Sequence, residues 1–185
     1  DGIYFATTTS PYKEKLGSAL IAMPLDLRRE IRTADVTHSL RAGASALAMA
    51  VDTVSAGSAG SVLVAAADMR LGAPNGAIEQ QVGDGAAAFL VGKENVIAEV
   101  QAMHSISDEL AGNWRAENDT YVRSWEDRMT LDSGWSVEIP AVLIGLMKKS
   151  GLGPDKFAKV VMDSPNDARR LPAAAAAAGF QPAQI

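Results

Sequence analysis

The chain has 185 residues, of which 48% are hydrophobic and 21% charged, a composition typical of a globular protein that can bury a core. A formal net charge of -5 and an aromatic content of 5% provide neither the basic surface nor the stacking side chains of a nucleic-acid-binding protein. No apolar run is long enough to cross a membrane, and the first residues lack the features of a signal peptide. The absence of cysteine excludes disulfides and cysteine-ligated metals. We therefore expect a cytoplasmic protein that binds neither nucleic acid nor membrane.

Strands and helices are predicted to alternate in the first part of the chain. A β-prone run at Ile3–Thr8 precedes apolar residues at helical spacing over Pro11–Met23. Thr33–Ser39 is the next predicted strand. It is followed by a long helix at Leu40–Ala56, which Gly57 is expected to end.

Further strands are predicted after this helix. The run Ser61–Ala67 is almost continuously apolar, as expected for a strand that is covered on both faces. Gly83–Gly92 and Val96–His104 are predicted to pair through a turn at Lys93–Asn95. This order of elements indicates an α/β fold in which helices cover both faces of one sheet.

The chain changes character at residues 105–135, which hold all three tryptophans among many charges. This segment is predicted to be an irregular excursion over the sheet, either a functional cover or a surface loop that its aromatic residues anchor. Helical periodicity returns at Val137–Lys149, and a strand at Phe157–Met162 and a helix at Ala173–Ala178 are predicted to follow.

Residues 34–47, with the sequence ADVTHSLRAGASAL, predict a buried strand that runs directly into a helix of small residues. The N-terminus of such a helix offers unpaired N–H groups and a positive dipole end, which stabilise an anion or a thioester oxygen. Ser39 at this junction is either a nucleophile or an N-cap. His38 is predicted to lie beside it in the strand, where neighbouring residues point to opposite faces and direct contact is disfavoured. His104 has no identified partner.

Four segments together resemble the condensing enzymes of the thiolase superfamily, and most closely hydroxymethylglutaryl-CoA synthase and 3-oxoacyl-acyl-carrier-protein synthase III. These segments are ADVTHSLRAGASAL, VSAGSAGSVLVAAADMR, VGDGAAAFLVG and VVMDSPNDAR. The resemblance implies two α/β halves in a layered αβαβα sandwich, and a CoA or carrier-protein thioester as substrate with no metal and no further cofactor. It also implies a homodimer or a heteromeric complex with another thiolase-like subunit.

On this basis, residues 1–104 are predicted to be the later part of the first thiolase-like half and residues 136–185 the start of the second. Residues 105–135 would form a cover loop between them. The last predicted helix has no strand after it, so we expect an internal portion of a longer chain. The alternative is a genuine domain of 185 residues.

The resemblance implies three catalytic positions, and this sequence departs from the family at each. Leu40 matches the nucleophilic cysteine and cannot be acylated. Asp163 matches the histidine that contacts the thioester oxygen; it is interpreted as a base or as a turn residue before Pro165, since a carboxylate would repel an oxyanion. Thr8 matches the acid–base glutamate of hydroxymethylglutaryl-CoA synthases and lacks its acidity.

Two functions follow from these residues. The first is an acyl-CoA or acyl-carrier acyltransferase with an altered site, in which Ser39, His38, Asp163 or residues outside this sequence carry the reaction. Arg41 and Asn166 are then expected to bind the substrate. The second is a catalytically silent structural or regulatory subunit that pairs with an active thiolase-like partner. The leucine at the cysteine position favours the second, and the retained Arg-Ala-Gly sequence after it favours the first.

Overall fold

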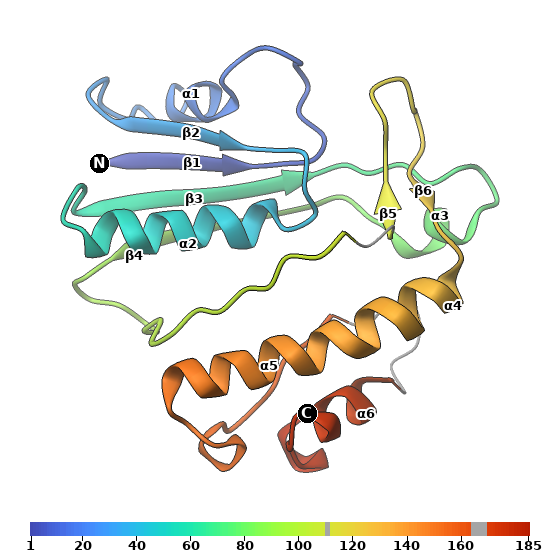
Figure 1. Cartoon of the computed structure of the whole chain (residues 1–185). Helices are drawn as coiled ribbons and strands as arrows, with labels where there is room; N and C mark the ends of the chain where they lie inside the picture. Colours follow the sequence, from blue (N-terminus) through green and yellow to red (C-terminus); the bar gives the residue numbers. More distant parts are fainter. Residues whose placement is uncertain (110–111, 164–169) are drawn as a thin grey trace. The chain divides into compact units, whose positions relative to one another are not determined.

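The computed structural model describes residues 1–109, 112–163 and 170–185, in which two compact units are recognised (Figure 1). Unit 1 consists of Asp1–Leu71 and Val82–Val100, and unit 2 consists of Gly72–Gln81 and Gln101–Ile185. Each unit is described by itself. Within the described ranges, no helix has the length and apolar character needed to span a membrane.

Unit 1 is built on a four-stranded sheet with the order β2-β1-β3-β4. Its strands are β1 (Gly2–Ala6), β2 (Arg32–Val36), β3 (Ser61–Asp68) and β4 (Gly85–Gly92). β1 runs parallel to both β2 and β3, whereas β4 pairs with β3 in the antiparallel direction. The carboxyl ends of β1, β2 and β3 therefore meet at one edge of the sheet, which is where open α/β sheets bind ligands.

One face of the sheet packs against the helix α2 (Ala42–Ser55). Tyr4 and Ala6 of β1 point to this face and belong to the core. On the helix side, the core is formed by residues that recur every four positions. These helix residues are Ala42, Ala46, Ala50 and Val54. Their small side chains let the helix lie close to the strands, as the density of alanine and glycine in this helix leads one to expect.

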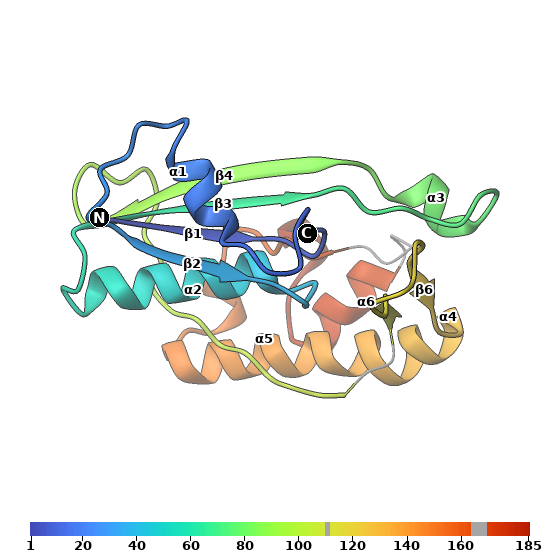
Figure 2. The same cartoon turned by 90° about the horizontal axis from the view of Figure 1, so that it is seen from above.

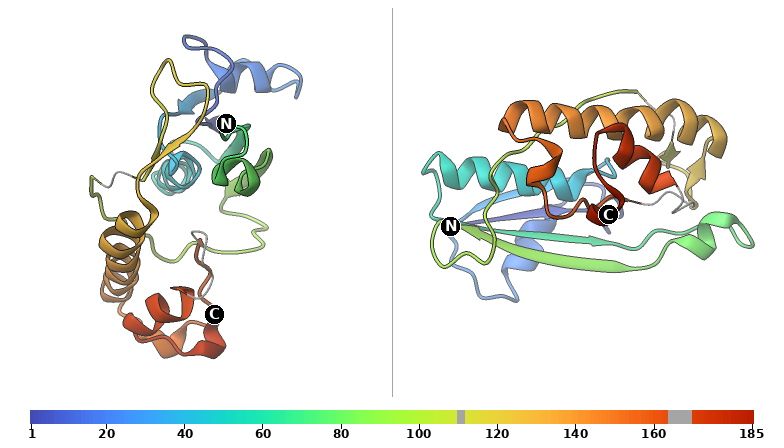
Figure 3. Two further views of the ribbon diagram at one scale, coloured as in Figure 1. Left: turned by 90° about the vertical axis from the view of Figure 1, so that its right-hand side faces the viewer. Right: turned by 90° about the horizontal axis from the view of Figure 1, so that it is seen from below.

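The opposite face of the sheet carries the short helix α1 (Gly17–Ala22), so the two helices lie on opposite sides of the strands (Figures 2 and 3). A Cβ atom on Gly17 would come within 2.8 Å of the Phe5 ring, which leaves room only for glycine. Asp35 of β2 accepts hydrogen bonds from the N–H groups of Gly17 and Ser18, at 2.5 and 2.8 Å. Helix α1 is thus capped by a side chain from a neighbouring strand.

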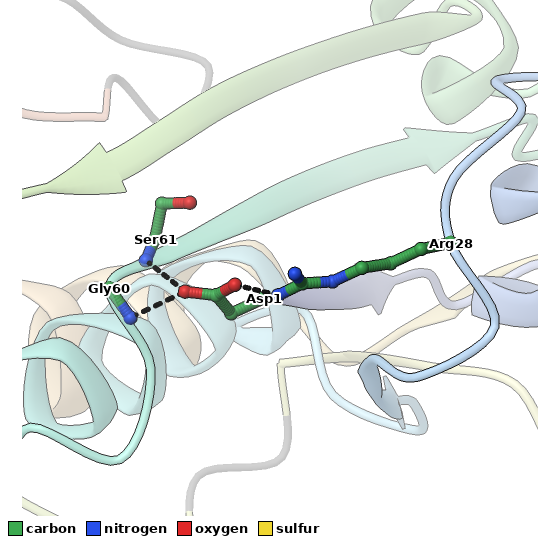
Figure 4. A network of polar contacts seen from close by, with 4 residues as sticks. All are labelled: Asp1, Arg28, Gly60 and Ser61. Atoms are coloured by element: carbon green, nitrogen blue, oxygen red, sulfur yellow. Dashed lines mark hydrogen bonds and ion pairs between the residues drawn. The ribbon is translucent and has the colours of Figure 1, made fainter.

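A polar network holds the amino-terminal end of β1 beside that of β3 (Figure 4). The carboxylate of Asp1 accepts hydrogen bonds from the backbone N–H groups of Gly60 and Ser61, at 2.7 and 3.3 Å. Its other oxygen forms an ion pair with the exposed Arg28, in the connection between α1 and β2. The network joins Asp1 to two connections, α2–β3 and α1–β2, at the edge of the sheet opposite the one formed by the carboxyl ends.

Unit 2 is mainly helical. Its elements are α3 (Ala77–Gln81), the hairpin strands β5 (Asn113–Trp114) and β6 (Arg123–Ser124), and the helices α4 (Asp127–Met129), α5 (Ser136–Ser150) and α6 (Arg170–Ala177). A π-helical turn at Thr130–Trp135 joins α4 to α5. Ala175 of α6, Ala178 and Phe180 form a small core, and Leu143 and Met147 of α5 pack against it.

Most predicted elements are confirmed. The four strands of unit 1 and the helices α2, α5 and α6 lie within a few residues of their expected bounds, and helices do cover both faces of the sheet. Sequence patterns predict the presence of a helix or strand more reliably than its first and last residues, because these ends depend on local hydrogen bonds.

Four expectations are wrong. The helix expected over Pro11–Met23 forms only at Gly17–Ala22, and the predicted strands Val96–His104 and Phe157–Met162 are not strands. The segment 105–135 is not wholly irregular, because β5, β6, α4 and the π-helical turn lie within it. Alternating apolar residues alone do not make a strand, which also needs a neighbour to receive its backbone hydrogen bonds.

Candidate functional site

The carboxyl ends of β1 and β3 border an open cavity of about 470 Å³ in unit 1. Its lining is mainly apolar with four polar side chains. The lining residues are Phe5, Thr7, Thr9, Pro11, Ala67, Asp68, Met69, Asp84, Gly85 and Ala86. A volume of this size is in the range of small-molecule sites.

The strand-to-helix junction predicted from residues 34–47 is present. β2 ends at Val36, α2 begins at Ala42, and Arg41 occupies the N-cap position. Leu40 lies in the turn between them with 59% of its surface exposed. The position that the resemblance assigns to the nucleophile is therefore open to solvent at the start of a long helix, and a leucine occupies it.

Ser39 makes local hydrogen bonds at the start of α2. Its hydroxyl accepts a hydrogen bond from the N–H of Arg41 at 3.2 Å, and its carbonyl accepts one from the N–H of Ala42 at 2.9 Å. The prediction that Ser39 is the N-cap residue is wrong by two positions, because the N-cap is Arg41. A bond between its hydroxyl and an early N–H group is nevertheless formed.

His38 does not lie in a strand, contrary to the sequence prediction. It follows β2 in a bend, with a φ of 66° that places it in the left-handed region. Its Nδ1 shares a hydrogen bond with the hydroxyl of Thr37 at 2.5 Å. The argument from strand alternation therefore does not apply to His38 and Ser39. A left-handed conformation in a residue other than glycine costs energy and is often found at functional sites.

Thr8 belongs to a hydrogen-bonded cluster that the sequence did not reveal. The Oδ1 atom of Asp68 accepts bonds from the backbone N–H of Thr8 at 2.6 Å and from its hydroxyl at 3.1 Å. The hydroxyls of Thr7 and Thr9 each donate to the same oxygen at 3.0 Å. The signal available in the sequence was Asp68 at the end of an apolar strand, but its partners are about sixty residues away.

The electrostatics of this cluster favour a charged carboxylate. Burial raises the pKa of Asp68, but the hydrogen bonds from Thr8, Thr9 and Thr7 lower it by more, so that the pKa lies below its ordinary value of 3.8. Asp68 is therefore ionised at neutral pH.

Thr8 and Leu40 follow β1 and β2, which are neighbouring strands of the sheet. Ala6 and Ala42, each two residues away from one of them, lie together in the core between the sheet and α2. β1 ends at Ala6, the N–H of Thr7 donates to the carbonyl of Val36 at the end of β2, and Thr7 and Thr9 line the cavity. Two of the three positions implied by the resemblance thus come from adjacent parts of unit 1.

The remaining predicted site residues do not belong to the Asp68 cluster. Asp163 lies exposed in an irregular stretch of unit 2, and Asn166 lies outside the described residues. Arg41 is exposed at the N-cap of α2. His104 does not end a strand, as predicted, but packs so closely on α5 that a Cβ on Gly145 would collide with its ring. In the part of the chain that the structure describes, no group of three or more possible metal ligands is found.

Comparison with curated proteins finds relatives named hydroxymethylglutaryl-CoA synthase, although no family model matches the chain. The hydroxymethylglutaryl-CoA synthase of Pyrobaculum arsenaticum is 30% identical over 174 residues, which cover 94% of this chain and 49% of that protein. The enzyme of the same name from Methanocaldococcus jannaschii is 29% identical over 164 residues, covering 89% of this chain and 47% of that protein. The chain spans about half the length of the curated relatives it matches.

Solved structures of condensing enzymes have the same fold. A hydroxymethylglutaryl-CoA synthase complexed with CoA gives a TM-score of 0.75 at 20% identity, over 86% of this chain and 41% of that one. The synthase III from Aquifex aeolicus gives 0.78 at 19% identity, over 100% and 60%. The synthase III from Thermus thermophilus gives 0.80 at 20% identity, over 98% and 60%. The chain therefore has a thiolase-like fold, of which it represents a portion, and it resembles hydroxymethylglutaryl-CoA synthase in sequence.

Proposed function

We propose that this chain, a relative of hydroxymethylglutaryl-CoA synthases with a thiolase-like fold, is part of a protein that binds acyl-CoA thioesters and acts as a condensing acyltransferase. The observation that carries the proposal is the similarity over 94% of the chain to a hydroxymethylglutaryl-CoA synthase, joined to an open strand-to-helix junction. Solved neighbours hold CoA and hydroxymethylglutaryl-CoA, which supports the same ligand class here.

The junction supports binding better than it supports acyl transfer. The first turn of α2 provides backbone N–H groups and the positive end of a helix dipole, which favour a thioester oxygen. Covalent catalysis needs a nucleophile that attacks the thioester carbon, receives the acyl group and releases the CoA thiol. The hydrocarbon side chain of Leu40 has no atom that can do this.

A second candidate function follows from that leucine. In this alternative, the chain is a catalytically silent structural or regulatory subunit, and a thiolase-like partner performs the acyl transfer. The absence of cysteine from these 185 residues favours it. Both functions share a cytoplasmic location and assembly as a homodimer or a heteromeric complex, which we propose on the basis of the resemblance to condensing enzymes.

Intact-protein mass spectrometry separates the two functions. The chain is incubated with acetyl-CoA or acetoacetyl-CoA, alone and with any protein that co-purifies with it. An acyl adduct on Ser39 of the chain would support acyl transfer by an altered site and exclude the silent subunit. Acylation of the partner alone would exclude catalysis by this chain.

A gain-of-function variant tests the geometry of the junction. Leu40→Cys places a thiol at the start of α2, where the helix dipole lowers the pKa of a thiol. We expect this variant to gain an acetyl adduct from acetyl-CoA. Met49→Cys is the matched control, because it places a thiol at an exposed position further along the same helix. Equal labelling of the two variants would show that the junction has no special reactivity.

A further inference from the structure

The hydrogen-bonded cluster around Asp68 connects the chain after β1 to the end of β3, and hydroxyls of the cluster both donate and accept hydrogen bonds. Besides donating to Asp68, the hydroxyl of Thr7 accepts the N–H of Thr9 at 3.0 Å. The hydroxyl of Thr9 likewise donates to Asp68 and accepts the N–H of Met69 at 2.9 Å. Each of these hydroxyls is therefore used both as donor and as acceptor, which leaves it little rotational freedom.

Where β1 ends, the carboxylate of Asp68 also takes the place of the backbone carbonyl that would accept the next hydrogen bond of the sheet. The parallel pairing of β1 with β3 ends at Ala6 and Ala66. Two residues later, the N–H of Thr8 is bonded to the side chain of Asp68 instead of a backbone carbonyl. Asp68 thereby determines the direction in which the chain leaves the sheet after Ala6.

The geometry is that of a single acceptor holding several donors. Oδ1 receives four hydrogen bonds from three consecutive threonines, and Thr7 is almost completely buried at 2% exposure. Hydrogen bonds to an ionised acceptor are stronger than those between neutral groups. The lowered pKa of Asp68 agrees with this arrangement.

We infer that Asp68 is a positioning residue of the acyl-CoA site: its carboxylate fixes residues 7–9 where β1 ends next to β2, the strand that leads into the junction carrying Leu40. This inference rests on the proposed function. It assigns to Asp68 no contact with the ligand, and it predicts that removing its charge changes ligand affinity through Thr8.

Two measurements on the full chain test the inference. Titration calorimetry measures the Kd of acetyl-CoA, and hydrogen exchange measures the protection of individual backbone amides. Asp68→Asn is expected to raise the Kd at least about tenfold and to speed exchange at Thr8 and Met69, while exchange at Tyr4 stays unchanged. Asp52→Asn, which removes the same charge at an exposed position on α2, is expected to behave as wild type.

Variants of the threonines separate positioning from general stability. Thr8→Val removes the hydroxyl that donates to Asp68 and should weaken acetyl-CoA binding, whereas Thr8→Ser keeps the donor and should restore it. Should Asp68→Asn fail to fold, Thr9→Val provides the second test. It breaks the bonds to Asp68 and Met69 and should speed exchange at Met69 and raise the Kd in the same direction.

Each contrary result points to a different failure. Faster exchange in Asp68→Asn with an unchanged Kd would overturn the inference and leave the proposed function standing. Unchanged exchange at Thr8 and Met69 would overturn the positioning role itself. Absence of acetyl-CoA binding by the wild-type chain would overturn the proposed function together with the inference.

Discussion

Leu40 is an exposed apolar residue in a turn that leads into a helix. A single exposed leucine is common at protein surfaces and contributes little to folding when solvent surrounds it. We therefore expect Leu40→Ala to change the free energy of unfolding by less than about 0.5 kcal/mol in urea titrations. By contrast, Ala46→Val adds two methyl groups to a position with 0% exposure and should cost about 1–3 kcal/mol. A large loss from Leu40→Ala would show that the side chain is buried in solution.

Asp68 gives the chain a stability term that depends on pH. Its pKa in the folded state is lowered below 3.8, so its contribution is fully present above that value and is lost as the pH falls through the folded pKa. Asp68→Asn is expected to destabilise the chain by on the order of 1–3 kcal/mol at neutral pH, and the difference from wild type should shrink in acid. Urea unfolding at a series of pH values measures this. A difference that is independent of pH would contradict an ionised acceptor.

At the scale of elements, helix α1 depends on contacts that its own sequence does not supply. Gly17→Ala should destabilise the chain by about 1–3 kcal/mol, although alanine is the better helix former, because its Cβ would meet the Phe5 ring at 2.8 Å. Gly43→Ala is the matched control. A Cβ there comes no nearer than 3.9 Å to Ala66, so this variant should be neutral or more stable by up to about 1 kcal/mol. Thermal unfolding compares the two, and equal effects would contradict the packing argument.

The elements that could be predicted from sequence are those whose pattern is local. The apolar run at Ser61–Ala67 is almost continuous and predicts β3, and small residues that recur at helical spacing predict α2. Phe157–Met162 has a similar apolar pattern, yet Val160 bonds the carbonyl of Gln184 and no strand forms. Whether an apolar segment becomes a strand is decided by its neighbours in space.

The same distinction applies to the candidate site. The junction at Leu40 is contiguous in sequence, so its place between strand and helix could be predicted. Asp35 capping α1 and Asp68 holding Thr8 could not, since their partners are 17 or more residues away along the chain. Side chains that stabilise another element's backbone leave no periodic pattern in the sequence.

At the scale of the molecule, β4 is an edge strand of the sheet in unit 1, and most of its apolar side chains are exposed. Its sequence, GAAAFLVG, contains no charge and no proline, and Leu90 is 74% exposed. Such edges promote association between chains. We expect concentrated solutions of the chain to self-associate, and Leu90→Lys to reduce light scattering without lowering the melting temperature. Met49→Lys adds the same charge on α2 and should leave association unchanged. A monodisperse wild-type chain at high concentration would contradict this expectation.

The π-helical turn at Thr130–Trp135 has a consequence for comparing this chain with its relatives. In a π turn, the N–H of Ser136 reaches the carbonyl of Leu131, five residues back instead of four. One extra residue rotates everything before it by about 100° relative to everything after it. The residues of α4 are therefore out of phase with those of α5, and an alignment that carries one helical register through both will assign the wrong residues to the buried side.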